Sequence, residues 1–337
     1  MKIRHQARRI LITGVSGFIG KALAVSLVGD GRVVRGTVRD LEASSGLLPD
    51  LGRDSLEVVA SGEIDSSTDW SMVLDNVDCV IHCAARAHVM RETERDALRA
   101  YRRVNFEGTS RLAEQAAAAG VRRMIFLSTI KVNGERTIEA VGGSAPKVTH
   151  AFSYDDPPAP EDPYGLSKWE AEQSLWQISE SAGLDAVIVR PPLVCGPGVR
   201  GNLSRLINLV KLGVPLPLAG VENKRSFICL SNLIDFITLC IDHPEASGKT
   251  FLVSDNKDLS TPALLRLIAE SMNTKARLFP FPLALLRATG VLFGKQHELD
   301  RLLGSFRVDS SYARNTLGWT PPIGTEDGIR EMVEQSF

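Results

Sequence analysis

Short runs of apolar residues alternate with longer amphipathic segments through the first half of the chain. Runs of this length, bounded by glycine and polar residues, are typical of strands buried on both faces. The expected strands are Arg9–Thr13, Val33–Val38, Leu56–Val59, Cys79–His82, Arg123–Leu127 and Ala186–Arg190. The expected helices are Ile19–Val28, Trp70–Leu74, Val104–Ala119 and Tyr164–Ser181. This alternation predicts an α/β fold with a doubly wound parallel sheet covered by helices on both faces.

The pattern changes after Arg190, where proline and glycine become frequent. We expect a partial return to the sheet at about 226–255, through Ser226–Leu230, the helix Leu233–Ile241 and the strand Thr250–Val253. The remainder has the mixed pattern of a smaller domain. The sequence therefore predicts a sheet domain over 1–190, with that return, and a second domain over 191–337.

Composition excludes several function classes. The net charge of the 337 residues is −1, which gives no electrostatic argument for binding nucleic acid or an anionic membrane. The five cysteines include no CxxC pair, so we predict reduced thiols and a cytoplasmic protein. Cys79 and Cys83 flank His82, but buried strand residues explain this spacing better than a metal site, and no metal is expected.

One apolar stretch, Leu278–Phe293, bears on membrane attachment. It contains Pro280, Pro282 and Arg287 and is shorter than the ~20 residues of a spanning helix. We therefore predict no integral membrane segment and a helix packed in the smaller domain, with peripheral membrane contact as the alternative.

A glycine-rich turn follows the first predicted strand and opens the first helix. Three glycines spaced three apart let the backbone approach a pyrophosphate, and the helix N-terminus supplies N–H donors and a positive dipole. Close helix packing would also explain the glycines, but their place in a βαβ unit favours a Rossmann dinucleotide site. The residues expected to bind the cofactor here are Gly14, Ser16, Gly17, Phe18, Ile19 and Gly20.

The end of the second strand bears on the choice of cofactor. In NAD-selective folds an acidic residue about 20 residues after the glycines binds the ribose hydroxyls. Arg39 occupies that place, and a guanidinium can pair with the 2′-phosphate of NADP. We therefore favour NADPH; the alternative is NAD, with Asp40 at the ribose. Further cofactor contacts are expected at Glu63, Ile64, Ala84 and Ala85.

Tyr164 and Lys168 lie one helical turn apart, on one face of a predicted helix. A free phenol, with a pKa of about 10, is a poor base at neutral pH. A nearby ammonium favours the phenolate, so this pair suits proton transfer to or from a sugar oxygen. The spacing alone is common by chance; its combination with the glycine turn indicates a nicotinamide-dependent enzyme.

These motifs together resemble the extended short-chain dehydrogenase/reductases, in the NAD-dependent epimerase/dehydratase branch that acts on nucleotide sugars. The resemblance spans nearly the whole chain. It rests on Thr13-Gly14, His82–Ala85, Asn105–Thr109, Leu127–Thr129, Tyr164 with Lys168, Arg190–Pro192, Arg225–Phe227 and Leu317–Pro321. The segment Ala84–Met90 is similar to bacterial enzymes of surface-polysaccharide (O-antigen) synthesis. Many of these are labelled UDP-glucose 4-epimerases, and others resemble 4-ketoreductases.

The resemblance implies roles for particular residues. Thr129, Tyr164 and Lys168 would be catalytic, and Tyr164, Lys168 and Pro191 would also bind the cofactor. Substrate contacts are expected at His88, Thr129, Lys131, Asn202 and Arg225. Asn105 would stabilise a kink in its helix, with helix packing as the alternative. Relatives often form homodimers through the helices expected here at Val104–Ala119 and Tyr164–Ser181.

Several functions remain open. A 4,6-dehydratase would need an Asp-Glu pair after Thr129, where this chain has Ile130-Lys131, so we set that reaction aside. We favour NADPH-dependent reduction of the C4 ketone of a UDP-4-keto-6-deoxy-N-acetylhexosamine, because of Arg39. The alternative is a redox-neutral C4-epimerase of UDP-glucose or UDP-N-acetylglucosamine with bound NAD. A dinucleotide-binding protein without chemistry is disfavoured, because Thr129, Tyr164 and Lys168 are all present.

Overall fold

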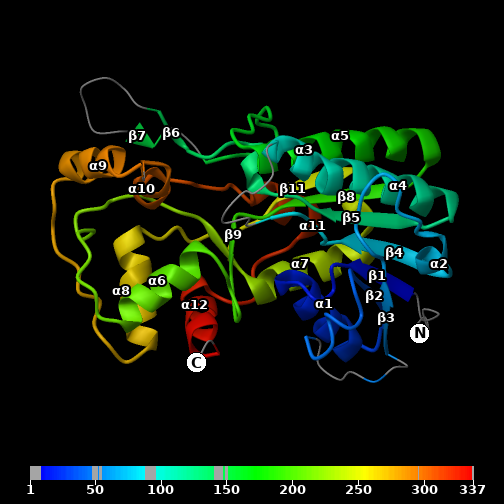
Figure 1. The fold of residues 1–337 in the computed structure, drawn as a ribbon, viewed down its shortest axis with the longest axis horizontal. Coiled ribbons are helices and arrows are strands. Elements are labelled where there is room, and N and C mark those ends of the chain that lie inside the picture. Colours follow the sequence, from blue (N-terminus) through cyan, green and yellow to red (C-terminus); the bar gives the residue numbers. More distant parts are fainter. Residues whose placement is uncertain are drawn as a thin grey trace.

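The computed structural model describes residues 9–47, 52, 55–87, 96–139, 147–148, 151–294 and 296–335. Its centre is a parallel sheet of seven strands in the order β11-β8-β5-β4-β1-β2-β3 (Figure 1). The strands are β1 (Arg9–Thr13), β2 (Val33–Val38), β3 (Leu56–Ala60), β4 (Val77–His82), β5 (Arg123–Leu127), β8 (Asp185–Arg190) and β11 (Lys249–Leu252). The predicted Rossmann-like α/β fold is confirmed.

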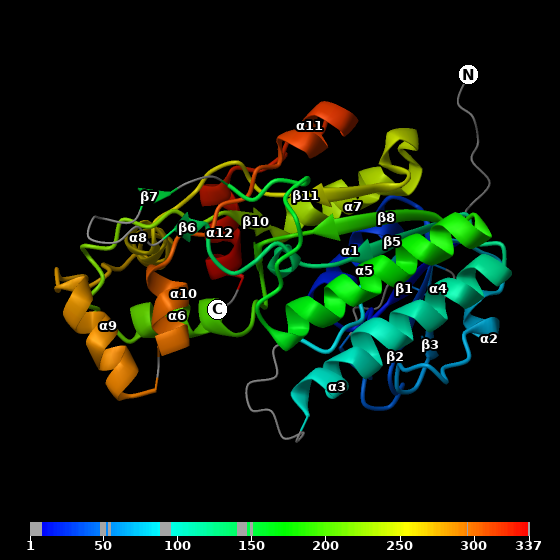
Figure 2. The same ribbon diagram turned by 90° about the horizontal axis from the view of Figure 1, so that it is seen from above.

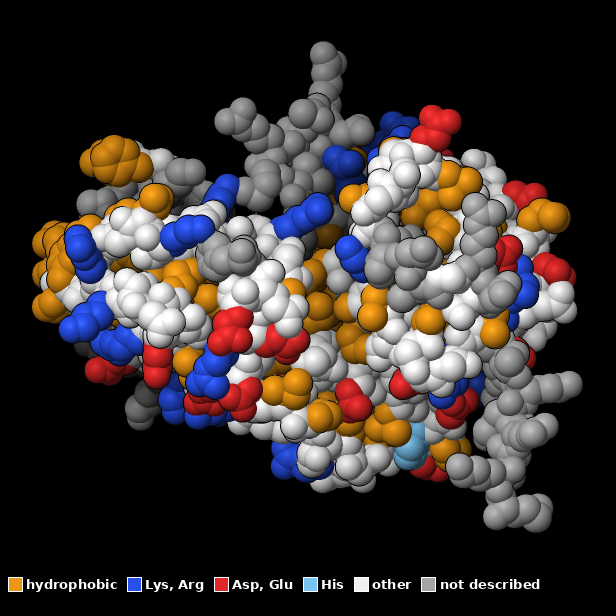
Figure 3. All heavy atoms as spheres, turned by 90° about the horizontal axis from the view of Figure 1, so that it is seen from below, with side chains coloured by type: hydrophobic (Ala, Val, Ile, Leu, Met, Phe, Trp, Pro, Cys, Tyr) orange, Lys and Arg blue, Asp and Glu red, His pale blue; other side chains and the backbone are white. Residues whose placement is uncertain are grey.

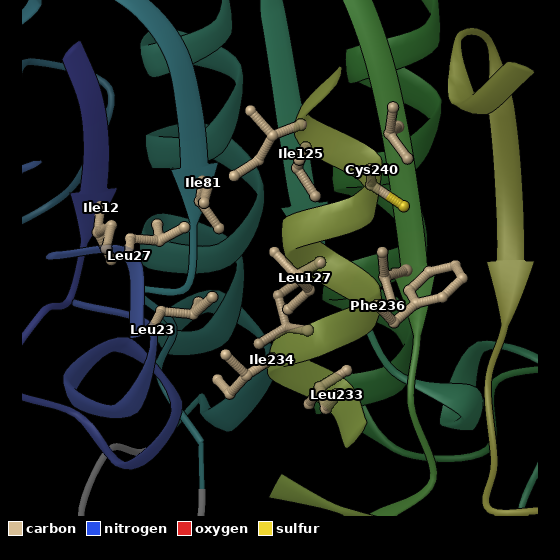
Figure 4. Close-up of a cluster of buried hydrophobic side chains, with 14 of the residues drawn as sticks. Ile12, Leu23, Leu27, Ile81, Ile125, Leu127, Leu233, Ile234, Phe236 and Cys240 are labelled. Carbon is tan, nitrogen blue, oxygen red and sulfur yellow. The ribbon is translucent and has the colours of Figure 1, made fainter. Parts of the chain in front are cut away.

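Helices cover both faces of this sheet. On one face lie α2 (Ser71–Leu74), α4 (Gly108–Ala118) and α5 (Pro163–Ala182). On the other lie α1 (Phe18–Gly29) and α7 (Leu230–Asp242), and their apolar side chains meet alternate residues of the central strands (Figure 4). Because both sheet faces are buried, the strands are apolar throughout rather than alternating. This explains why the strands were predictable as continuous apolar runs.

The sequence prediction was wrong in one helix. A single helix was expected over Val104–Ala119, but the structure has α3 (Ala97–Arg102), a π-helical turn at Arg103–Glu107, and then α4. α3 and α4 lie beside α5 over the sheet (Figure 2). A π-turn adds a residue to one turn of helix and is common at functional sites, and apolar periodicity does not reveal it.

The expected return to the sheet at 226–255 is correct only in part. The helix α7 and the strand β11 do join the main sheet. The strand at 226–230 does not: β10 (Phe227–Cys229) pairs with β9 (Leu193–Cys195) in a separate parallel two-stranded sheet. β10 ends at Cys229 and α7 begins at the next residue, Leu230, so the chain passes from this small sheet directly into a helix of the sheet domain.

The C-terminal part packs around its own apolar cluster, to which β9 and β10 contribute. Its helices are α6 (Asn202–Lys211), α8 (Thr261–Ser271), α9 (Leu283–Leu292), α10 (Gln296–Leu303) and α12 (Thr325–Glu334), while α11 (Ser311–Leu317) packs beside β11. Two strands of two residues each, β6 (Ile138–Glu139) and β7 (Lys147–Val148), form a separate antiparallel pair. No helix in the described part of the chain has the length and apolar character needed to cross a membrane.

Arg123 ties α7 to the sheet. Its guanidinium, at the first residue of β5, is only 3% exposed, and its Nε donates to Asp185 at 2.6 Å. Its Nη1 donates to the carbonyls of Cys240, Ile241 and His243 at 2.6–3.1 Å, which are the unpaired acceptors at the end of α7. A cation at this helix end is also favoured by the helix dipole.

We predict that Arg123→Met lowers the free energy of unfolding by about 3 kcal/mol, because it leaves Asp185 and the α7 carbonyls without their buried partner. Arg32→Met is the control: it removes an exposed ion pair with Asp242 and should cost less than about 1 kcal/mol. Urea denaturation of both variants tests this. Equal losses would contradict the assignment.

Candidate active site

The glycine turn lies between the carboxyl end of β1 and the start of α1. Gly14 has φ +68°, and a Cβ there would lie 2.9 Å from the Ala84 Cα. A Cβ on Gly20 would lie 2.3 Å from the Gly14 carbonyl oxygen. Side chains are therefore excluded at both positions, and the turn is tied to the loop after β4.

The start of α1 fits a pyrophosphate group. Gly17 caps the helix without a side-chain hydrogen bond, and the first turn holds no acidic residue. The first N–H groups of the helix, from Phe18 onward, therefore remain available to an anion. Ser16, Phe18 and Ile19 are partly exposed around this turn. This chain can hold a dinucleotide here with donors of its backbone alone.

The Arg39 side chain is 75% exposed just past β2, and its Nε lies 3.2 Å from the Glu63 carboxylate. Asp40 accepts a hydrogen bond from the Ala43 N–H at 3.0 Å. The Ile64 side chain, which was expected to contact the cofactor, packs against Gly108 of α4. Arg39, the residue predicted to pair with the 2′-phosphate of NADP, pairs with Glu63 in the structure.

Tyr164 and Lys168 lie in the first turns of α5, as predicted. Lys168 is 1% exposed, and its Nζ lies 3.9 Å from the centre of the Phe126 ring. Burial lowers the pKa of Lys168 to about 7, and the negative charge of Glu172 partly opposes this. Burial also raises the pKa of Tyr164, as do Asp162 and the nearby Tyr101. Without a further positive charge, the phenol therefore stays protonated at neutral pH.

Thr129 is placed against the start of α5. It follows β5 and caps a short 3₁₀ turn, where its Oγ1 accepts from the Lys131 N–H at 3.3 Å. A Cβ on Gly165 would lie 2.9 Å from the Lys131 carbonyl oxygen, so the turn and the helix are in close contact. Pro191 lies beside them, because its carbonyl accepts from the Ile130 N–H at 3.1 Å. The structure therefore brings Thr129, Pro191 and α5 together.

A chain of buried hydrogen bonds starts at the cofactor turn. The Thr109 hydroxyl donates to the Asn105 carbonyl at 2.6 Å, so it accepts from His82 Nε2 at 3.0 Å. His82 Nδ1 must then accept from the Thr13 hydroxyl at 2.6 Å, while the Ala84 N–H donates to Thr13 Oγ1 at 3.2 Å. Burial, and next Lys168, lower the pKa of His82 to about 3, so the ring is neutral.

Asn105, in the π-turn, carries this chain on to α5. Its Oδ1 accepts from the Arg86 N–H at 2.8 Å, and its Nδ2 donates to the Arg86 carbonyl at 3.1 Å and to Ser167 Oγ at 3.0 Å. The Ser167 hydroxyl donates to the Tyr164 carbonyl at 2.8 Å. Both Asn105 and Ser167 are fully buried. The predicted helix distortion at Asn105 is therefore present, and the loop after β4 and the start of α5 are held to one residue.

A buried ion pair lies beneath Lys168. Glu172, one turn farther along α5, binds Arg190 through two hydrogen bonds at 2.5 and 3.0 Å. Ser128 donates to the same carboxylate, and Arg190 also donates to Asn133 at 2.9 Å. This group joins the ends of β5 and β8 to α5, on either side of Thr129.

Four charged side chains lie together at the start of α5. Lys131 pairs with Glu135 at 2.8 Å and with Asp162, and Asp162 also caps α5 through the Gly165 N–H at 2.7 Å. Arg301 of α10 pairs with Glu135 at 3.0 Å. Burial acts to raise the pKa of Glu135, but Lys131 and then Arg301 lower it to about 2. This acid is therefore ionised.

Arg225 extends this group. Its Nη1 donates to the carbonyls of Arg301 and Gly304 at 2.5 and 3.1 Å. Burial, and next the charge of Arg301, lower the pKa of Arg225 to about 10, so it remains a cation at neutral pH. Asn202 is exposed at the first position of α6, without a contact to these residues among those described. His88 lies outside the described residues.

Sequence reasoning missed Asp162, Glu135, Arg301 and Glu172. Asp162 carries a helix-start signal, because it precedes Pro163 at the first position of α5. Glu172 lies four residues after Lys168, on the same helix face. Glu135 and Arg301 are far apart in the sequence, and no local pattern joins them. Among the described residues, no group of His, Cys, Asp and Glu is arranged to hold a metal ion.

Known proteins share this architecture over the whole chain. A "UDP-glucose 4-epimerase" of Vibrio cholerae is 41% identical over 334 residues, which cover 98% of this chain and 96% of the relative. The structure titled MoeE5 in complex with UDP-glucose and NAD has a TM-score of 0.74 and 25% identity, over 97% of this chain and 98% of that one. A UDP-glucuronic acid 4-epimerase from Bacillus cereus, in complex with NAD, shares the fold at a TM-score of 0.76 and 21% identity, over the same shares of the two chains.

The family model described as "NAD dependent epimerase/dehydratase family" matches residues 10–254. This segment contains the glycine turn, Thr129, Tyr164 and Lys168. It confirms the resemblance stated from the motifs. This chain belongs to the NAD-dependent epimerase/dehydratase family.

Proposed function

We propose that this protein is a redox-neutral C4-epimerase of a UDP-hexose, such as UDP-glucose or UDP-N-acetylglucosamine, working with a tightly held NAD. The carrying observation is Tyr164 and the buried Lys168 on one helix, tied to the glycine turn through His82 and Asn105. This geometry suits exchange between a secondary alcohol and a ketone. The 41% identity to the Vibrio cholerae protein favours epimerisation over net reduction.

The environment of Arg39 supports NAD. Its guanidinium is already paired with Glu63, and a 2′-phosphate beside Glu63 would meet a like charge. The structures of MoeE5 and of the Bacillus cereus enzyme are both described with NAD. When bound, a nicotinamide dinucleotide supplies a hydride acceptor and donor for C4. The alanines at 84 and 85 and the uncapped start of α1 would hold its diphosphate half.

Tyr164 would take the proton of the C4 hydroxyl. It would return that proton to the same oxygen after the ketone has turned its other face to the cofactor. Its pKa is raised, so the phenolate must be stabilised by positive charge. Lys168 is the cation placed for this, one turn away. Thr129 would donate a hydrogen bond to the reacting oxygen, which lowers the cost of charge developing there.

The diphosphate of the substrate would lie near Arg225, where the chain offers a partly exposed cation. Lys131 and Asn202 remain proposed substrate contacts, on the sugar and the diphosphate. The division into a cofactor domain over 1–190 and a sugar-nucleotide domain over 191–337, and the homodimer, also remain proposals.

A second candidate is NADPH-dependent reduction of a UDP-4-keto-6-deoxy-N-acetylhexosamine in polysaccharide synthesis. The 75% exposure of Arg39 favours it, since the side chain is free to turn from Glu63 toward a 2′-phosphate. Thr129, Tyr164 and Lys168 serve both reactions. The two candidates therefore share these catalytic residues and differ in the sugar and in whether reduced cofactor is consumed.

We predict that the purified protein interconverts UDP-glucose and UDP-galactose, or the N-acetylated pair, without added reduced cofactor, because the hydride returns to C4 and the proton returns to its oxygen. Proton NMR of the sugar measures the inversion at C4. In parallel, the protein is mixed with NADPH and the 4-keto-6-deoxy sugar, and absorbance of reduced nicotinamide is followed. Stoichiometric loss of absorbance without any epimerisation would establish the second candidate instead.

We predict that Tyr164→Phe reduces kcat by about a thousandfold, because the acid–base group is lost while the ring is retained. Binding of the UDP-sugar, measured by calorimetry, should change little. Tyr312→Phe is the matched control, since that ring stacks on Tyr154, away from α5. Unchanged turnover by Tyr164→Phe would refute the proposed chemistry.

We predict that Lys168→Met stabilises the cofactor-free protein below pH 7. The pKa of this amine is about 7 in the folded chain and about 10 in the unfolded chain. Between these two pH values the unfolded chain therefore binds more protons than the folded chain. The stability of the wild-type protein therefore gains from this group as pH rises through that window. Urea denaturation at about pH 6 and about pH 9 should show a larger benefit of the substitution at pH 6. A smaller gain in stability over wild type at pH 6 than at pH 9 would contradict this.

A further inference from the structure

The C-terminal part exposes an apolar surface that nothing in the described structure covers. Of twelve large apolar side chains exposed among the described residues, seven fall in two short segments, 212–214 and 279–293. They are Leu212 (75%), Val214 (36%), Phe279 (41%), Leu285 (56%), Val291 (62%), Leu292 (78%) and Phe293 (74%). We call these seven residues the apolar end patch.

The helix α9 contributes three residues of this patch, Leu285, Val291 and Leu292, because it is apolar on two faces. Leu283 and Leu286 pack inward on the C-terminal core, and Gly290 lies against Leu299 of α10. The outward face carries Leu285 and Leu292, with Val291 and then Phe293 beside them. A helix that is apolar on both its inner and its outer face is ordinarily buried on both. The outer face of α9 therefore lacks a partner among the described residues.

The two segments of the patch are neighbours in space. Leu216 pairs with the strand-like stretch at Leu278: its N–H donates to the Arg277 carbonyl at 2.8 Å, and the Phe279 N–H donates to its carbonyl at 3.0 Å. Figures 1 and 2 both place α9 at the end of the molecule away from the seven-stranded sheet. In Figure 3 that end shows hydrophobic side chains bordered by Lys and Arg.

The stretch of chain that carries five of the seven patch residues is basic. Residues 271–297 contain no Asp or Glu, but they include Lys275, Arg277 and Arg287, all of which are exposed. Lys211 and Glu334 line the same depression, so the charge of Lys211 does not add to this positive excess. The whole chain has a net charge of −1, so this local excess is not a reflection of overall composition.

We propose that the apolar end patch is a peripheral docking surface for a bilayer containing anionic lipids. Exposed Leu, Val and Phe side chains enter the boundary between headgroups and acyl chains, and surrounding Lys and Arg side chains bind the lipid phosphates. The chemistry of the patch matches both layers of such a surface. The proposal is independent of the reaction catalysed, since no residue of the patch belongs to the candidate active site.

A second copy of the chain is a poorer occupant. A symmetric dimer through this patch would bring the same surface of both protomers together. Lys275, Arg277 and Arg287 of both protomers would then lie in one interface, and like charges across an interface oppose association. An anionic surface has no such conflict.

The test is flotation of the full chain with vesicles. Wild-type protein should float with vesicles of equal parts phosphatidylglycerol and phosphatidylcholine, and much less with phosphatidylcholine alone. Raising the salt concentration should release it, because screening weakens the charged contacts. Leu292→Asp should reduce the bound fraction about tenfold, since it removes an inserting side chain and adds repulsion.

Met72→Asp is the matched control: Met72 is 83% exposed on α2, far from the patch, and the charge change is the same. It should float like wild type, and circular dichroism should show both variants folded. Three results would overturn the proposal: no flotation of wild type, equal flotation of Leu292→Asp, or self-association through Leu292 without vesicle binding.

Discussion

The buried amide of Asn105 is the constraint on which the candidate site depends. A fully buried amide must have its donors and acceptor satisfied, and here all its partners come from outside its own helix: the Arg86 backbone and the Ser167 hydroxyl. The π-turn also leaves the Asn105 carbonyl to accept from Thr109, which leads through His82 to Thr13 at the glycine turn. These hydrogen bonds join the glycine turn, the loop after β4 and the start of α5, and the proposed proton and hydride transfer would need such fixed positions.

The same region carries an energetic conflict. Burial lowers the pKa of Lys168 to about 7 and raises the pKa of Tyr164. The folded chain alone therefore favours neither the ammonium of Lys168 nor the phenolate of Tyr164. Glu172 lies near Lys168, but its carboxylate is already paired with Arg190, so it offsets only part of the cost of burying the ammonium. A buried amine of this kind lowers the stability of the folded chain at pH values where it is charged.

Most of the sheet could be predicted from the sequence, because strands buried on both faces appear as apolar runs; β1, β2 and β5 have the predicted limits. The glycine turn and the Tyr164–Lys168 pair were also predictable, since both depend on local spacing. The separate pairing of β10 with β9 and the Arg39–Glu63 pair were not, and the distortion at Asn105 was expected only from the family resemblance. That distortion involves hydrogen bonds from Asn105 to Arg86 and Ser167, β10 pairs with a strand distant in the sequence, and Arg39 pairs with a carboxylate 24 positions along the chain. Each is a tertiary constraint that leaves no periodic signal.

The central claim is that this preorganised site returns the same hydride to the carbon from which it came. The direct measurement uses a UDP-hexose labelled with deuterium at C4, incubated with the purified protein and analysed by mass spectrometry and NMR. The account predicts that the inverted sugar keeps the deuterium at C4 and that the solution gains no reduced nicotinamide. Loss of the label from the sugar, with deuterium recovered in free reduced cofactor, would contradict it and would indicate an enzyme of net oxidation or reduction.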